Sequence, residues 1–231
     1  FILYRDIFEN NLPGAFLFHV ILGKTVGYDA FPLRIVDFCI LAGLAVTTWK
    51  IVNPISKPGA ILASCIFTGL YLFTGSATEL QRDYLGILPI AIAVWLVTYE
   101  RRNIIEKSIF LGALCGLSCG FKPNYIIIFP TLYFLLYQEM RLATPLYKLR
   151  SLLWMGVSFT AIFSIPLLWA YQKADYAALI KIYQTFTPIY LQSRTDLYHY
   201  SSHHEKVMDL LKNQLTHLKT ILTFAMPGLL W

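Results

Sequence analysis

Long apolar runs alternate with short polar or turn-forming stretches over most of this sequence. The longest runs approach the roughly 20 residues that a helix needs to cross a bilayer, and they lie at 31–52, 59–75, 84–99 and 151–171. A shorter run at 12–28 predicts a helix that lies at the membrane interface instead. The pattern therefore predicts an all-α polytopic membrane protein, a transmembrane helix bundle of about seven spans with interfacial helices in its first external loop.

Two further runs, 108–120 and 124–138, predict a helical hairpin. The hairpin should break at Lys122, because Pro123 disfavours a helical backbone at the residue before it. Glycines recur every fourth residue ahead of this break, at Gly112, Gly116 and Gly120. In a membrane helix this spacing predicts close packing against a neighbouring helix, and it says little about phosphate-binding loops.

The same pattern divides the chain into three regions. We expect a transmembrane core over 1–171, an external segment rich in polar and aromatic residues over 172–219, and the start of a further transmembrane helix over 220–231. The chain begins with Phe1 rather than Met and stops at Trp231 inside an apolar run. We therefore expect it to be a piece of a longer protein, with a first span that precedes Phe1.

Composition supports the membrane class. Of the 231 residues, 57% are hydrophobic and only 14% are charged, and the mean hydropathy is +0.56, more apolar than a soluble core of this size needs. The net charge of +6 comes from Lys and Arg in short clusters between the apolar runs, so it predicts contact with membrane lipids and not with nucleic acid. The four cysteines lie inside apolar runs without metal-ligand spacing, which predicts buried free thiols.

The basic clusters also predict an orientation. Short loops at 50–57, 100–107 and 141–150 hold most of the Lys and Arg between spans, so we place them on the cytoplasmic side. Alternation of the spans then puts the opening stretch, the patch at 76–83, the break at Lys122 and the segment 172–219 on the opposite, extracytoplasmic side. That side then holds, among other charged residues, Asp6, Glu9, Glu79, Arg82, Asp83 and Lys122.

Several short stretches carry a resemblance to a known family. They are Tyr4-Arg5-Asp6 followed by Asn10 to Gly14, Gly27-Tyr28-Asp29, Pro32-Leu33-Arg34, Thr78-Glu79-x-x-Arg82-Asp83, and Gly116-x-x-x-Gly120-Phe121-Lys122-Pro123. In this order and sidedness the chain resembles the GT-C superfamily of membrane glycosyltransferases over most of residues 1–170. More narrowly, it is similar to the bacterial branch that includes protein mannosyltransferases and aminoarabinose lipid A transferases.

The resemblance implies an activity and a location. It implies inverting transfer of a sugar from a polyprenyl-phosphate donor to a lipid, glycan or protein acceptor, at the extracytoplasmic face of a bacterial inner or plasma membrane. In that family an Asp-Glu pair in the first external loop carries the catalytic acid, upstream of the stretch that matches Tyr4-Arg5-Asp6. We therefore expect the primary general base to lie outside this chain.

Glycosyl transfer explains why these residue types would be needed. A carboxylate must take the proton of the acceptor, and cations or helix N-termini must stabilise the departing phosphate. The candidate catalytic residues are Asp6 and Asp83. The candidate substrate-binding residues are Lys122, as the phosphate ligand, with Arg82, Glu79 and Arg5.

Each candidate has a simpler alternative. Lys122 could be an interfacial lysine that extends to water. Arg82 and Asp83 could form an ion pair of their own, because an acid in the first helical turn suits the helix dipole. Asp6 could serve a turn before Pro13-Gly14. Arg34 stands one turn before Asp37, so these two side chains can pair along their helix.

Other functions stay open at this level. No cofactor is indicated beyond the lipid-linked sugar; a divalent metal could bind at His199, His203 and His204, although such histidines in an aqueous segment are usually solvated. A multi-pass transporter would show charges near the bilayer middle and paired broken helices. A non-catalytic membrane subunit also fits the composition.

Overall fold

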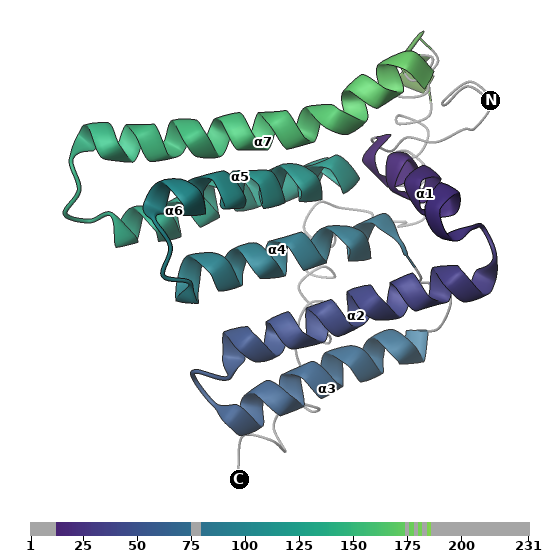
Figure 1. Ribbon diagram of the computed structural model, residues 1–231, viewed down its shortest axis with the longest axis horizontal. Helices are drawn as coiled ribbons and strands as arrows, with labels where there is room; N and C mark the ends of the chain where they lie inside the picture. The colour runs from purple at the N-terminus through teal and green to yellow at the C-terminus, as the bar shows by residue number, and fades with distance from the viewer. Residues whose placement is uncertain (1–12, 75–79, 174–175, 178–179, 182–183, 186–231) are drawn as a thin grey trace, which may run out of the picture. The chain divides into compact units, whose positions relative to one another are not determined.

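The computed structural model describes residues 13–74, 80–173, 176–177, 180–181 and 184–185 (Figure 1). Its contacts divide the chain into two units, Phe1–Tyr176 and Ala177–Trp231, and the helices described below all belong to the first. The elements are α1 (Pro13–Val26), α2 (Ala30–Val52), α3 (Lys57–Thr74), α4 (Arg82–Tyr99), α5 (Ile104–Phe121), the 3-10 helix η2 (Pro123–Ile127), α6 (Ile128–Glu139) and α7 (Pro145–Lys173). The protein is an all-α membrane bundle, as the sequence predicts.

The long helices lie side by side, and consecutive ones run in opposite directions (Figure 1). The packing order differs from the chain order: α3 packs on α2, α2 on α4, α4 on α5, and α5 on α7, with α6 against α4 and α5. The short helix α1 contacts α5 and α7, and touches α2 more lightly. This order brings the starts of α2 and α4 to the same end of the bundle as the break between α5 and η2.

Four of the described helices, α2, α4, α5 and α7, are long and apolar enough to cross a membrane. Helix α5 is the central one, because 56% of the residues in its most apolar stretch are buried, against only 17% in that of α7. The apolar segments of α1 and α3, Pro13–Val26 and Lys57–Phe73, are shorter. Exposed large side chains such as Phe38, Leu70 and Val157 give the helices an outer surface suited to lipid tails. Two of the predicted buried thiols, Cys39 and Cys65, are exposed instead, whereas Cys115 and Cys119 are buried.

Two helices begin earlier than predicted. Helix α7 starts at Pro145, so more than half of the expected basic loop 141–150 is helical. Proline suits the first helical turn, because its missing N–H is one that has no partner there in any case. Helix α5 starts at Ile104, inside the expected loop 100–107, with the Asn103 side chain accepting a hydrogen bond from the Ile105 N–H at 2.9 Å. Hydropathy marks the lipid-facing part of a helix, and these helices continue past it.

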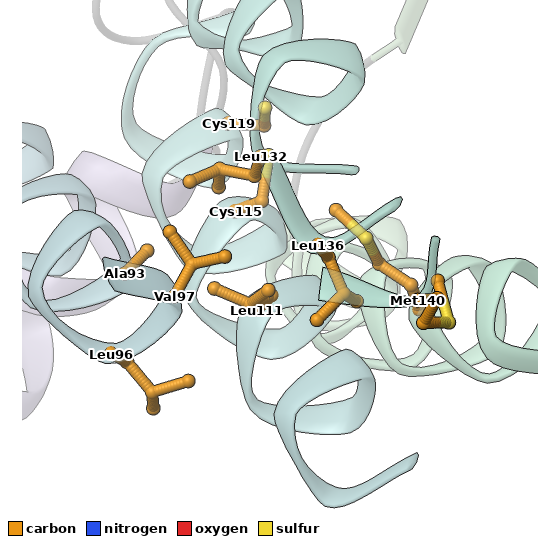
Figure 2. Packing of buried hydrophobic residues seen from close by; sticks show 10 residues of the cluster. Ala93, Leu96, Val97, Leu111, Cys115, Cys119, Leu132, Leu136 and Met140 are labelled. Atoms are coloured by element: carbon orange, nitrogen blue, oxygen red, sulfur yellow. The ribbon is translucent and has the colours of Figure 1, made fainter. Parts of the chain in front are cut away.

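The core lies where α4, α5, α6 and α7 meet. Figure 2 shows this packing, in which the buried side chains are Ala93, Leu96, Val97, Leu111, Cys115, Cys119, Leu132, Leu136, Met140 and Met155. The predicted glycine packing is confirmed on α5, because a methyl group at Gly112 or Gly116 would collide with the α7 carbonyl oxygens of Met155 or Phe159. Close contact between α5 and α7 therefore fixes the direction in which α5 ends at Phe121.

Candidate functional site

The bundle has two ends, which we name after their lysines. At the Lys122 end, α2 and α4 begin and α5 stops, whereas at the Lys107 end α5 begins and α6 stops. The predicted basic loops at 50–57 and 100–107 and the basic stretch at 141–150 all belong to the Lys107 end. Sequence alternation therefore grouped the loops correctly, and Asp83, Arg82 and Lys122 share the other end.

Lys122 and Asp83 form an ion pair at this end. The Lys122 Nζ lies 2.8 Å from Asp83 Oδ1, and the Arg82 Nε lies 3.7 Å from the same oxygen. The side chains of Lys122 and Asp83 are 32% and 50% exposed, although Oδ1 itself is covered and has no hydrogen bond of good angle. The two cations hold the carboxylate through charge, and the group remains open to water.

Local backbone structure explains where these side chains lie. Lys122 has φ −143° and ψ 115°, an extended conformation that ends α5 and precedes η2, as the effect of Pro123 predicts. Asp83 stands in the first turn of α4, where a carboxylate interacts well with the positive end of the helix dipole. The predicted pairing of Arg82 with Asp83 is confirmed, but Asp83 also pairs with Lys122 across the bundle.

Tyr125 fixes the distance between η2, which follows Lys122, and the first turn of α4, which holds Asp83. Its hydroxyl donates a hydrogen bond to the Asp83 carbonyl oxygen at 2.8 Å, and its ring lies so close to Gly86 that a methyl group there would collide with it. Side chains from η2 and α4 are thereby held in register.

Asp37 is a residue of this end that the sequence analysis considered only as a partner of Arg34. The Arg34 Nη1 does lie 3.9 Å from Asp37 Oδ2, which confirms that pairing. However, Asp37 is fully buried, and its Oδ1 accepts hydrogen bonds from the Tyr71 hydroxyl at 2.5 Å and the Leu80 N–H at 3.3 Å. The available signal was an acidic residue inside an apolar span, which is rare and usually has a specific role.

An apolar cavity of about 210 Å³ lies between α1, α5 and α7. Gly120 and Phe121 line it, and Lys122 is the next residue of the chain. Phe18 of α1 packs edge-on against Phe121, with ring centres 5.9 Å apart. The last two cavity-lining residues of α5 therefore directly precede the partly exposed Lys122 in the chain.

Other predicted site residues lie outside the described residues, namely Arg5, Asp6 and Glu79, and so do the three histidines near residue 200. The expected external segment 172–219 and the run at 220–231 also lie almost wholly outside them. Within the described ranges, no three His, Cys, Asp or Glu side chains gather in a way that could hold a metal ion. Arg82, Asp83 and Lys122 are therefore the predicted site residues that the structure describes.

Comparisons of the chain with protein-family models, with curated protein sequences and with solved structures give no significant match.

Proposed function

We propose that this protein is a membrane glycosyltransferase, which transfers a sugar from a polyprenyl-phosphate donor to a lipid, glycan or protein acceptor. The observation that carries the proposal is the partly exposed ion pair of Lys122 with Asp83 at the broken end of α5. A cation that is paired with a carboxylate and accessible to water can exchange that partner for a phosphate. The apolar cavity lined by the preceding residues, Gly120 and Phe121, is chemically suited to the first part of an isoprenoid chain.

The charges of this end match the needs of inverting transfer. The acceptor oxygen attacks the anomeric carbon, the bond from that carbon to the phosphate oxygen breaks, and the polyprenyl phosphate leaves with the electron pair. Lys122 and Arg82 stabilise the negative charge that grows on the phosphate. The acceptor proton goes to a carboxylate. Asp83, released from Lys122 by the bound phosphate, orients the acceptor or assists the primary base expected upstream of this chain.

The proposal places the Lys122 end on the extracytoplasmic side, because the basic loops gather at the Lys107 end. A membrane-impermeant maleimide tests this in intact cells with single-cysteine variants. Gln81→Cys at the Lys122 end should react from outside, whereas Asn103→Cys at the Lys107 end should react only after the cells are opened. Labelling of Asn103→Cys from outside would overturn the orientation and, with it, the location of the reaction.

The role of Lys122 is tested in the full-length protein with a polyprenyl-phosphate sugar as donor. Lys122→Ala should weaken donor use strongly, and Lys122→Arg should restore part of it, because arginine keeps the charge with a different shape. The matched control is Lys24→Ala, an exposed lysine in the last turn of α1, which should leave donor use unchanged. Unchanged donor use in Lys122→Ala would leave Lys122 only the role of an interfacial lysine.

Transport is the second candidate, favoured by two ionisable groups that are buried in the bundle, Asp37 and Lys107. Lys107 stands in the first turn of α5 and Asp37 lies further along α2, and each has partners within the protein. The two functions differ in a direct measurement. Purified protein in detergent should release polyprenyl phosphate only when an acceptor is present, whereas a transporter would give no such product and would need a sealed vesicle to show activity.

A further inference from the structure

Asp37 connects three separate parts of the chain at the Lys122 end. Its carboxylate oxygen Oδ1 accepts the Tyr71 hydroxyl from α3 and the Leu80 N–H from the turn before α4. Its backbone carbonyl oxygen accepts the Tyr84 hydroxyl from α4 at 3.3 Å, and the rings of Tyr71 and Tyr84 stack with centres 4.3 Å apart. A buried carboxylate in an apolar span is costly unless it is bonded in this way.

Leu80 is the unusual member of this group. It has φ +48°, the only positive φ among the described residues other than glycine, and leucine gains nothing from that conformation. Two contacts hold it there. Its N–H donates to Asp37 Oδ1, and its side chain is only 4% exposed, packed with Leu22, Leu85 and Phe121. Backbone in this region persists only where the surroundings impose it.

The turn at Leu80 sets where α4 begins. Gln81, the cap residue of α4, follows Leu80 directly and makes no side-chain capping bond to the helix. Arg82 and Asp83 follow directly in the first turn. The direction in which the Asp83 carboxylate leaves the backbone, toward Lys122, therefore depends on how Leu80 is held.

We propose that Asp37 is a positioning residue that holds the Leu80 turn, so that Asp83 meets Lys122, without itself touching a substrate. Its effect on the turn stands by itself, and its effect on sugar transfer rests on the proposed function. The bond to Leu80 needs an oxygen acceptor and not a negative charge. This distinguishes positioning from proton transfer or ion binding, both of which need a carboxylate that ionises.

Hydrogen exchange at the Leu80 amide, measured with the protein in lipid nanodiscs, tests the effect on the turn. Asp37→Leu removes the acceptor at similar volume and should accelerate exchange at Leu80 about tenfold, with no change in the amides of α5. Asp37→Asn keeps an amide oxygen at the same place and should stay close to the wild type. The matched control is Thr47→Val on the same helix, because the Thr47 hydroxyl donates to the Gly43 carbonyl oxygen within α2 itself.

The transfer assay with a polyprenyl-phosphate sugar provides the second measurement. Asp37→Leu should lower kcat by about 10²-fold, the usual cost of a misplaced catalytic group, with a smaller change in KM, and Asp37→Asn should recover most of the rate. Equal losses in Asp37→Asn and Asp37→Leu would overturn positioning in favour of a charge-dependent role. Unchanged exchange at Leu80 in Asp37→Leu would overturn it as well.

Folding and function can be told apart in this design. If Asp37→Leu also accelerates exchange in α5, the measurement is repeated with Asp37→Ser. The serine hydroxyl removes the acceptor as well, because it is one bond too short to reach the Leu80 N–H. Faster exchange at Leu80 alone in Asp37→Ser supports the proposal, and unchanged exchange contradicts it. The wild-type protein could also transfer no sugar while Asp37→Leu still exchanges faster at Leu80. That pair of results would refute the proposed glycosyltransferase function and leave the positioning role of Asp37 intact.

Discussion

The two ends of the bundle each hold a lysine paired with a carboxylate, and the two pairs differ in burial. At the Lys107 end, the Lys107 Nζ lies 2.8 and 2.7 Å from the two Glu139 oxygens, and the lysine side chain is 3% exposed. At the Lys122 end, Lys122 is 32% exposed and approaches one oxygen of Asp83. The buried Lys107 bonds to both carboxylate oxygens of Glu139 and is therefore fixed to this partner. The Lys122–Asp83 pair is partly exposed, so it can open to admit a ligand.

The neighbours of the two pairs differ in the same sense. Next to Lys107, Ser108 and Ser151 are both fully buried and share a hydrogen bond of 2.7 Å between α5 and α7. Next to Lys122, the backbone leaves the helix, and an apolar cavity lies against Gly120 and Phe121. One lysine therefore serves helix packing, and the other stands at a break in the packing, where irregular backbone usually marks a binding site.

The largest expected effect is on activity at the Lys122 end. Asp83→Asn should lower the rate of sugar transfer by about 10²-fold to 10⁴-fold, the usual contribution of a positioned acid or base. The assay is turnover per amount of protein in the membrane. Glu100→Gln, which removes a partly exposed carboxylate paired with Arg102 at the Lys107 end, is the control and should transfer normally. Normal turnover in Asp83→Asn would mean that Asp83 has no role in the reaction and serves only to stabilise the first turn of α4.

The next largest effect is on stability at the Lys107 end. Glu139→Ala leaves the Lys107 ammonium buried without its partner, and should lower the free energy of unfolding by about 3 kcal/mol, the lower part of the range for such pairs because Glu139 is 40% exposed. Denaturant titration of the reconstituted protein measures it.

A double variant checks the cause of that loss. Lys107→Met with Glu139→Leu replaces the pair by apolar side chains and should recover most of the stability. Stability in Glu139→Ala equal to that of the wild type would show that water reaches Lys107, and the contrast between the two ends would disappear.

The smallest effect separates exposure from location. Glu100 and Arg102 also belong to the Lys107 end, but this pair has no buried cation, because the Arg102 side chain is 45% exposed; its Nε lies 3.3 Å from the Glu100 Oε1. Glu100→Gln should change the free energy of unfolding by only about 0 to 1 kcal/mol. A loss as large as that in Glu139→Ala would mean that charge at this end, rather than burial, decides stability.

Local sequence patterns were enough to predict the helices and the break. Apolar runs of sufficient length require helices in a bilayer, because each backbone N–H and C=O must find a partner within its own segment. Pro123 determines the extended backbone of Lys122, and the glycines of α5 determine where α7 approaches. The helix starts at Ile104 and Pro145 were not predicted, because hydropathy reports the lipid-facing part of a helix and not its hydrogen bonding.

The sequence by itself thus determined the class of the protein and gathered Arg82, Asp83 and Lys122 at one end by alternation. Only the tertiary structure decided which residues bond to one another across the bundle. Asp83 with Lys122, Lys107 with Glu139, and Asp37 with Leu80 are each separated by more than 30 residues. Periodicity along one helix reaches a turn or so, whereas these pairs depend on which helices pack together and on how deeply each side chain is covered.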